Sequence, residues 1–170
     1  MTLRLLSALL LAAFVAACTP VPETAEDVRI IPASEVPVIQ KAHVDALNAF
    51  RADRGLPPVA LSARLTAAAR THARDMSVQR RAWHFGSDGT SPRDRAARAG
   101  FAGVVVGENI SESYDDPVTL FQSWLDDPNT RRVLEAPGAD SVGLGWFQEP
   151  DGKLWWVQLL GDSSVIQPVS

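Results

Sequence analysis

The chain has 170 residues, of which 46% are hydrophobic and 21% charged, a composition typical of a globular protein with a single buried core. Its formal net charge is −4 at pH 7. This charge gives no electrostatic basis for binding nucleic acid, because proteins that do so present an excess of positive charge.

The N-terminal segment has the features of a secretory signal peptide. Arg4 precedes an apolar run over residues 5–15, and small residues stand directly before Cys18. The run is shorter than the roughly 20 residues that a membrane-spanning helix needs. We therefore predict that residues 1–17 are removed on export.

Cys18 is predicted to carry a lipid that attaches the protein to a membrane. Val15-Ala16-Ala17-Cys18 resembles a bacterial lipobox, and Cys18 is the only cysteine, so an intramolecular disulfide is excluded. The alternative is an ordinary signal peptide whose cleavage region contains a cysteine. Residues 18–36 would then be the lipidated N-terminus and a proline-containing linker.

These features predict an exported protein, anchored to the cell membrane on its extracytoplasmic side. Thr19 follows Cys18, where an aspartate would indicate retention at the inner membrane of a Gram-negative cell. In such a cell we expect a periplasmic location at the outer membrane.

Two amphipathic helices are predicted in the first half of the domain. Apolar residues at helical spacing indicate a helix over residues 37–54, which Gly55 ends. Ser62 is a good N-cap for a second helix, whose apolar face includes His72. We expect His72 to be a hydrogen-bonded core residue, and His43, beside the apolar face of the first helix, to be another.

The second half predicts two more helices and three strands. Ser91-Pro92 and Asp116-Pro117 each place a capping side chain before a proline that fits the first helical turn. We expect strands at residues 104–106, 142–148 and 154–160, the last two joined by the turn sequence Glu149-Pro150-Asp151-Gly152.

This order of elements predicts an α+β fold in which helices flank a small, mainly antiparallel sheet. We assign residues 37–163 to this single domain and residues 164–170 to a C-terminal tail.

Several short motifs along the chain resemble, in their order, those of a known family. The family is the CAP superfamily, which comprises cysteine-rich secretory proteins, antigen 5 and pathogenesis-related proteins, and whose domain is also called the SCP domain. The resemblance is to its bacterial branch, covers about residues 38–161 and implies an α-β-α sandwich with a central cleft. The motifs are Asn48 and Arg51 before Gly55-Leu56-Pro57-Pro58, Ala68 to Ala73, Met76, His84 with Asp88-Gly89 and Arg95, Gly107-Glu108-Asn109-Ile110, Trp124, Val142-Gly143-Leu144-Gly145 and Trp156-Val157-Gln158.

The resemblance also implies a set of residues lining the cleft. Typical members have a tetrad of two histidines and two acidic residues, which sometimes binds a divalent metal. His84 matches the first histidine and Glu108 the first acid. Asp127 could supply the second acid, but Thr130 stands where bacterial relatives have the second histidine. The implied cleft therefore contains an incomplete tetrad.

An incomplete tetrad changes which metals the cleft could hold. A threonine hydroxyl is a poorer ligand than imidazole for zinc-like ions, and three side chains fall short of a calcium cage. We expect no cofactor. A divalent metal, if bound, would have to use His84, Glu108 and Asp127.

His84 and Glu108 are the candidates for catalysis. A carboxylate beside a histidine fixes its tautomer and suits the pair to proton transfer. The alternative is a hydrogen-bonded pair that only holds a loop against the sheet. The sequence contains no Gly-x-Ser-x-Gly, His-Glu-x-x-His or phosphate-binding glycine motif. A Ser-His-Glu arrangement would rest on proximity in sequence alone, with Ser87, Ser91 or Ser111 as nucleophile.

Three hypotheses for the function follow. We favour a non-catalytic envelope domain that binds a lipid or polysaccharide in the cleft or at an arginine-rich face. The second is a hydrolase, protease-like or metal-assisted, that uses His84 and Glu108; the third is a structural or partner-binding lipoprotein whose protein partner the sequence does not identify. The arginine-rich face, which has a solvated helical surface as its simpler interpretation, comprises Arg70, Arg74, Arg80, Arg81, Arg93, Arg95 and Arg98.

Overall fold

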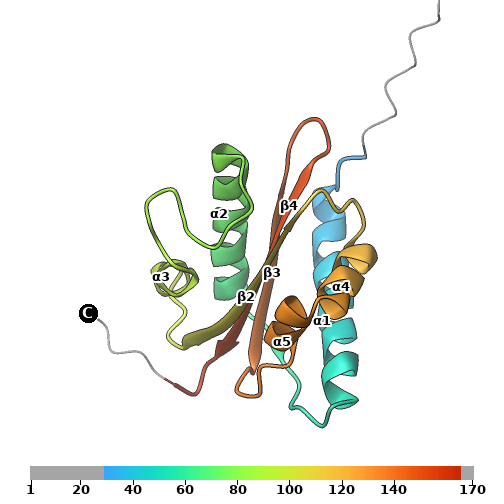
Figure 1. The fold of residues 1–170 in the computed structure, drawn as a ribbon, viewed down its shortest axis with the longest axis vertical. Helices are drawn as coiled ribbons and strands as arrows, with labels where there is room; N and C mark the ends of the chain where they lie inside the picture. Colours follow the sequence, from blue (N-terminus) through green and yellow to red (C-terminus); the bar gives the residue numbers. More distant parts are fainter. Residues whose placement is uncertain (1–28, 166–170) are drawn as a thin grey trace, which may run out of the picture.

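The computed structural model describes residues 29–165, which form a four-stranded sheet between two layers of helices (Figure 1). β1 is parallel to β3, whereas β3 with β4 and β4 with β2 are antiparallel. The strand order β1-β3-β4-β2 leaves β2 at one edge of the sheet. The bounds are β1 (Ala60–Leu61), β2 (Val104–Glu112), β3 (Ser141–Gln148) and β4 (Leu154–Asp162).

Helices cover both faces of this sheet (Figure 1). One face carries α1 (Val36–Ala52), α4 (Pro117–Asp126) and α5 (Pro128–Leu134). The other face carries α2 (Ala63–Gln79) and α3 (Pro92–Arg98). A single 3₁₀ turn, η1 (Ala33–Glu35), leads into α1. The predicted α+β fold, with helices on both sides of a mainly antiparallel sheet, is confirmed.

Side-chain caps begin three of the helices where the sequence predicts them. Ser62 accepts a hydrogen bond from a backbone N–H in the first turn of α2, and Asp116 does the same for α4. At α3, Ser91 and Asp94 bond reciprocally to each other's backbone N–H, which makes a complete capping box.

Besides the 3₁₀ turn η1, the structure contains two elements that the sequence prediction missed. α5 begins at Pro128, and the Asp127 carboxylate caps it by accepting a hydrogen bond from the backbone N–H of Asn129 at 2.8 Å. Asp127-Pro128 repeats the signal of Asp116-Pro117, so a second helix start could have been recognised. β1 is only two residues long and shows no periodicity that a sequence pattern could reveal.

Part of the predicted linker belongs to the folded domain. The backbone N–H of Ile31 donates to Gln148 Oε1 at 2.8 Å, and Gln148 Nε2 donates to the carbonyl of Arg29 at 2.9 Å. The domain therefore extends N-terminally of the predicted boundary at residue 37. The predicted signal peptide, the predicted lipid attachment site Cys18 and residues 166–170 lie outside the described residues. Within residues 29–165, every helix is too short or too polar to cross a membrane.

Two glycines of β3 let α2 lie directly on the sheet. A Cβ atom on Gly143 would approach the backbone carbon of Leu65 to 2.3 Å, and one on Gly145 would approach the backbone nitrogen of Arg70 to 2.5 Å. Such distances are not tolerated between real atoms, so only glycine permits this approach. The close contact fixes the position of α2, and with it the position of His72.

Arg51 is a fully buried cation on α1. Its guanidinium donates to the carbonyls of Pro57 at 2.8 Å, Leu134 at 2.9 Å, Ala136 at 3.0 Å and Ala139 at 3.1 Å. No acidic side chain within residues 29–165 forms an ion pair with it. Backbone carbonyls alone therefore replace the water that this charge loses on burial. Their bonds to Arg51 also hold α1 against two segments, the one after α1 and the one at the end of α5.

His43 and His72 are both buried, as predicted, but only one of them is hydrogen-bonded. His72 Nε2 lies 2.8 Å from the carbonyl oxygen of Trp83. His43 instead lies edge-on to Phe121 and Trp124, with ring centroids 5.3 and 5.9 Å apart, and neither of its nitrogens has a partner among the described residues. The prediction of a bonded histidine is therefore wrong at His43, where aromatic rings take the place of polar partners.

This environment should make the domain sensitive to acid. Burial lowers the pKa of His43 from 6.5 to about 4, because the charged imidazolium would lose its hydration. As pH falls below 6.5 the unfolded chain binds the proton first, so stability is lost between pH 6.5 and about 4. The loss from this group should approach 3 kcal/mol, on the order of 1.4 kcal/mol per unit of pKa shift.

The measurement is urea unfolding of the wild type and His43→Leu over this pH range. The leucine variant lacks the titrating group, so the difference in free energy of unfolding between the two proteins should change by about 3 kcal/mol from pH 7 to pH 4. A constant difference over that range would contradict the assignment of a buried neutral imidazole at His43.

Candidate functional site

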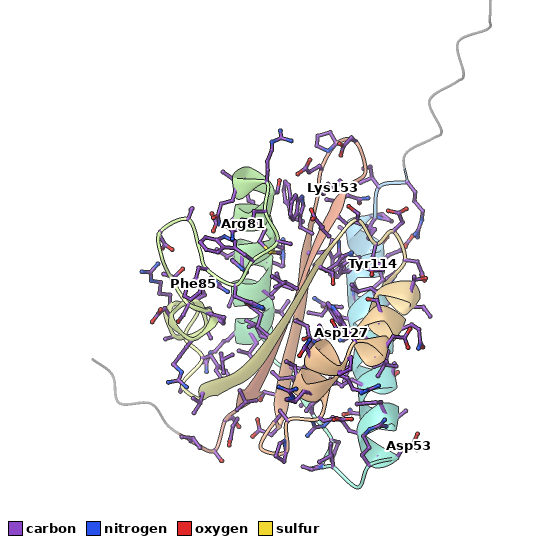
Figure 2. All side chains as sticks on the ribbon, in the orientation of Figure 1. Asp53, Arg81, Phe85, Tyr114, Asp127 and Lys153 are labelled. Carbon is purple, nitrogen blue, oxygen red and sulfur yellow. The ribbon has the colours of Figure 1, made fainter. Side chains whose placement is uncertain are left out.

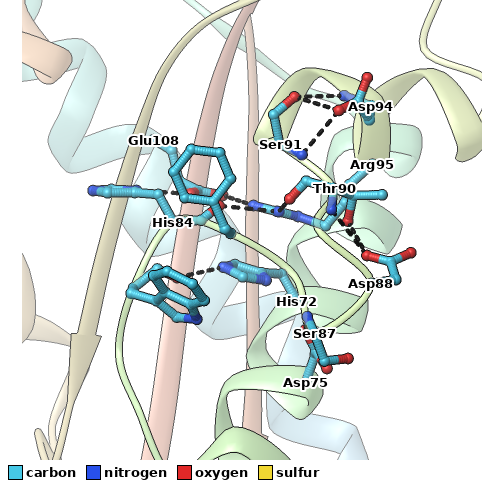
Figure 3. Close-up of polar contacts among 12 residues, drawn as sticks. His72, Asp75, His84, Ser87, Asp88, Thr90, Ser91, Asp94, Arg95 and Glu108 are labelled. Atoms are coloured by element: carbon cyan, nitrogen blue, oxygen red, sulfur yellow. Dashed lines mark hydrogen bonds and ion pairs between the residues drawn. The ribbon is translucent and has the colours of Figure 1, made fainter.

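The two sequence-predicted residues His84 and Glu108 meet at the edge strand of the sheet. Glu108 is on β2 with its side chain 3% exposed, and His84 is in the loop between α2 and α3. His84 Nδ1 lies 2.8 Å from Glu108 Oε1, and Arg95 Nη2 donates to Glu108 Oε2 at 2.7 Å. Figure 3 shows the three side chains in a row, with Glu108 in the middle. Both carboxylate oxygens are thus already bonded within the domain.

Arg95 comes from α3 and is nearly as buried as Glu108. Its Nη1 donates to the carbonyls of Thr90 at 2.8 Å and His84 at 3.1 Å. One guanidinium therefore neutralises the buried carboxylate and also holds both ends of the loop segment that presents His84. Arg95 belongs to the motifs that resemble the family, but the motifs do not predict this role. The role depends on Glu108, which lies 13 residues away on another element.

Further contacts to α2 fix this loop, which spans residues 80–91. His72 bonds to the carbonyl of Trp83, and Trp83 Nε1 donates to Gln79 Oε1 at 2.8 Å. The backbone N–H of Ser87 donates to Asp75 Oδ2 at 2.7 Å. His84 is therefore presented from a loop that side chains hold on both sides (Figure 3).

The geometry of His84 determines what its ring can do. A carboxylate can only accept, so Nδ1 carries the proton donated to Glu108 and Nε2 is left free. The side chain is 54% exposed, which leaves the ring open to a ligand. Among the described residues, no serine, threonine or cysteine bonds to His84: Ser91 caps α3, and Ser111 accepts from Trp124 Nε1 on the opposite face. The arrangement can bind a hydrogen-bonding group, but it lacks a bound nucleophile.

Thr130 lies on the other side of the sheet from the Glu108 side chain. Successive residues of a strand point to opposite faces, and Asn109 donates to the carbonyl of Thr130 at 3.0 Å, whereas Glu108 bonds to α3. The Thr130 hydroxyl donates to the carbonyl of Trp124 at 2.9 Å, within its own helical layer. This hydroxyl is therefore engaged in the α4–α5 junction rather than in a shared site with His84.

Asp127 also serves the α4–α5 junction, as the N-cap of α5. Figure 2 places Asp127 on the α5 side of the sheet and Phe85, the neighbour of His84, on the α3 side. The structure thus brings His84 and Glu108 together, adds Arg95, and leaves Asp127 and Thr130 in the opposite layer.

The donor set does not fit a metal ion. Residues 29–165 contain no group of three or more His, Cys, Asp or Glu side chains that could hold one. The oxygens of Glu108 are taken by His84 and Arg95, and Asp127 caps a helix. A cation placed beside Glu108 would also meet the guanidinium of Arg95 at close range, which like-charge repulsion disfavours.

The predicted arginine-rich face is not one uniform patch. Arg95 is buried, and Arg98 pairs with Asp88 at 2.5 Å. Arg81 lies over the Trp83 ring, 4.1 Å from its centroid, and Arg74 lies 5.7 Å from the Phe147 ring. Several of these charges therefore have partners within the domain.

Comparisons with known proteins agree with this architecture. The model of the cysteine-rich secretory protein family, CAP, matches residues 44–160. No protein of curated function matches the chain in sequence. Among solved structures, an outer surface protein of Borrelia burgdorferi superimposes with a TM-score of 0.67 at 18% identity, covering 74% of this chain and 92% of that one.

Two other bacterial structures have the same fold. An extracellular protein containing an SCP domain from Bacillus anthracis gives a TM-score of 0.68 at 20% identity over 78% of this chain. A cysteine-rich secretory protein from Staphylococcus aureus gives 0.58 at 17% identity over 79%. The aligned parts are only 44% and 41% of those two chains, so these likenesses concern the domain alone.

The family match covers most of the described residues, and the layered fold is the one that these structures share. The chain belongs to the cysteine-rich secretory protein (CAP) family.

Proposed function

We propose that this protein binds a ligand in the cell envelope without catalysing a reaction, and that a lipid on Cys18 anchors it there. The observation that carries the proposal is that each oxygen of the Glu108 carboxylate is already bonded, one to His84 and the other to Arg95. A buried carboxylate held in this way positions and neutralises its neighbours, and a metal or a substrate proton would have to compete with both of them for its oxygens.

Export and anchoring are supported by the N-terminal sequence and by the relatives. The lipobox-like segment ends in the only cysteine of the chain. The similar bacterial proteins are described as an outer surface protein, an extracellular protein and a secretory protein. An extracytoplasmic domain on a lipid anchor would have membrane lipids and cell-wall polymers as the nearest ligands.

The surface around His84 suits such ligands. The His84 ring offers a free nitrogen, and the Phe85 side chain beside it is half exposed. Trp83 packs against Phe85 with ring centroids 5.7 Å apart, under the guanidinium of Arg81. Aromatic faces and a fixed polar group together bind amphipathic or carbohydrate surfaces.

Isothermal titration calorimetry of the full-length chain with cell-wall fragments and envelope lipids tests the proposal. We expect binding, and we expect His84→Ala to weaken it about fivefold, the cost of one hydrogen bond of about 1 kcal/mol. Val118→Ala is the matched control, because Val118 is exposed on α4 in the opposite layer. Absence of binding at millimolar ligand would overturn the proposal.

A hydrolase is the second candidate, because the His84 orientation is the one that a general base requires. Its carboxylate partner is buried, whereas the His84 side chain itself is half exposed. Arg95 offsets the carboxylate charge, however, and the site has no bound nucleophile within residues 29–165. We therefore expect equal background turnover of ester, peptide and glycoside substrates by the wild type and His84→Ala, with and without chelator. Turnover that depends on His84 would favour the hydrolase.

A further inference from the structure

Charge is divided unevenly between the two sides of the sheet. Residues 63–98 form α2, α3 and the loop between them, and they cover one face (Figure 1). This segment contains eight arginines and three aspartates, a net charge of +5, whereas the whole chain has −4, so all other residues together carry −9. A domain divided in this way is attracted to a negatively charged surface by one side and repelled by the other.

Three arginines of this segment form an exposed ridge on α2, which we call the α2 ridge. They are Arg64, Arg70 and Arg74, and at this spacing they lie within about a third of the helix circumference. None of the three has an ion pair in the part of the chain that the structure describes. Arg74 lies 5.7 Å from the centroid of the Phe147 ring, a contact that leaves its charge in place. The only acidic residue of α2, Asp75, is bonded to Gln79. The ridge therefore presents positive charge alone.

The chain enters the domain beside this ridge. A pocket of about 350 Å³ has Arg70 of α2 and Trp146 of β3 among its lining residues, and the others belong to the turn before α1 and the start of α1: Ala33, Val36, Pro37 and Gln40. Gln148, two residues after Trp146, bonds to the backbone of Arg29 and Ile31. The first residues that the structure describes therefore lie on the same side of the domain as Arg70.

The distance from this point to the predicted lipid is limited by the length of the chain. Only residues 19–28 separate Cys18 from Arg29. Ten residues span at most about 35 Å when fully extended. A lipid on Cys18 would thus confine the domain to a thin layer above the membrane, where even a weak attraction acts at high effective concentration.

We propose that the α2 ridge docks on the anionic phospholipid surface of the membrane in which Cys18 is anchored. Each arginine beside an anionic leaflet strengthens such binding roughly fivefold. Trp146, partly exposed next to Arg70, is of the residue type that favours the headgroup region. The inference rests on the lipid anchor of the proposed function and adds the orientation of the domain.

This orientation separates the membrane contact from the candidate ligand site. Pocket and tether lie beside β3, next to the edge strand β1, whereas Glu108 is on β2 at the other edge of the sheet. Docking through the α2 ridge would leave the exposed His84 ring accessible from the envelope space.

Fluorescence quenching in vesicles tests the orientation. The lipoprotein is isolated from cells and reconstituted at its full mature length. Cys18 is the only native cysteine and would be blocked by its lipid, so one introduced cysteine can carry a fluorophore. Ala67→Cys places the label on the exposed side of α2, between the arginines of the ridge, and Val118→Cys places it on α4 in the opposite layer.

The vesicles contain lipids with a spin-labelled headgroup that quenches a fluorophore on contact. We expect strong quenching of the Ala67→Cys label in vesicles of phosphatidylglycerol and phosphatidylcholine in equal parts, and little in phosphatidylcholine alone. The Val118→Cys label should be quenched weakly in both. Added salt should release the ridge, because it screens the attraction between exposed charges.

Charge variants locate the contact. Arg70→Gln should lower the ratio of docked to undocked protein about fivefold, and Arg70→Gln/Arg74→Gln about thirtyfold. Arg132→Gln is the matched control, because it makes the same change of charge at an exposed position of α5 in the opposite layer. It should leave the ratio unchanged.

Several results would overturn the inference. Equal quenching of the two labels, or equal quenching in the two kinds of vesicle, would mean that the ridge does not dock. Equal effects of Arg70→Gln and Arg132→Gln would show that overall charge, not this surface, controls the contact. Release by soluble poly-L-glutamate at a charge concentration matched to the anionic lipid would make a soluble polyanion the preferred partner.

The mass of the isolated protein separates this inference from the proposed function. A protein that carries the lipid but does not dock would overturn the inference and leave the anchor and the ligand-binding function intact. A mass without a lipid on Cys18 would overturn the anchor and this inference together.

Discussion

Replacing Arg51 by methionine should lower the free energy of unfolding by about 3–5 kcal/mol, one of the two largest effects that we expect from a single substitution. The four carbonyls that Arg51 bonds would lose a charged donor, and each hydrogen bond to a charged group is worth roughly 1.5–3 kcal/mol. The substitution also removes a buried charge, and the folded state then no longer has to offset the desolvation of that charge. This recovers part of the free energy lost with the four hydrogen bonds. Methionine keeps an apolar stem in place, so the change isolates the guanidinium.

Arg54→Met is the matched control for this experiment. Arg54 follows the end of α1, pairs with Glu135 at 2.9 Å and lies over the Phe50 ring, but it is exposed. Contacts of this kind contribute less than about 1 kcal/mol each. Urea unfolding should therefore separate the two arginines, with Arg51→Lys between them, because one ammonium cannot span four carbonyls. Equal losses for Arg51→Met and Arg54→Met would show that the buried bonds do not hold the fold.

Glu108→Gln should cost about 3–5 kcal/mol, although it preserves the shape of the side chain. Glutamine leaves the Arg95 charge buried without a counter-charge, and breaking a buried ion pair from one side has a cost of this size. The loop that carries His84 should loosen as well, since Arg95 also bonds the carbonyls of His84 and Thr90. Urea unfolding measures the first effect, and amide hydrogen exchange of residues 83–90 measures the second.

The same strand offers a control. Glu112 ends β2, is 44% exposed and pairs with Lys153, so Glu112→Gln should cost less than about 1 kcal/mol. The double variant Glu108→Gln/Arg95→Met removes the unpaired charge and should recover part of the loss. A double variant that is less stable than the sum of its single changes would mean that charge balance is not the source of the effect.

The sequence was sufficient to predict elements whose ends are encoded locally. Ser62, Ser91 and Asp116 each sit beside the helix that they cap, and the β3–β4 turn lies between the strands that it joins. Such signals act over three or four residues and need no knowledge of the fold. α5 was missed although Asp127-Pro128 gives the same signal, because it begins directly after α4, with only Asp127 between the two helices.

The site could be predicted only in part, because its chemistry depends on contacts between distant residues. The His84–Glu108 pair followed from motifs, but the neutralising role of Arg95 depends on how α3 packs. No sequence pattern indicates the face on which Thr130 lies, since that is set by the path of the chain around β2.

The neighbouring residues Glu108 and Asn109 have a consequence for how β2 aligns with the rest of the sheet. An edge strand is the one most free to slide past its neighbour, and a shift of one residue would exchange its two faces. Here such a shift would turn the carboxylate toward α5 and the amide toward Arg95, with loss of the polar bonds on both faces. The irregularity between Val105 and Gly107 lies immediately before this pair. The polar bonds of Glu108 and Asn109 therefore favour the observed register of β2 over a register shifted by one residue.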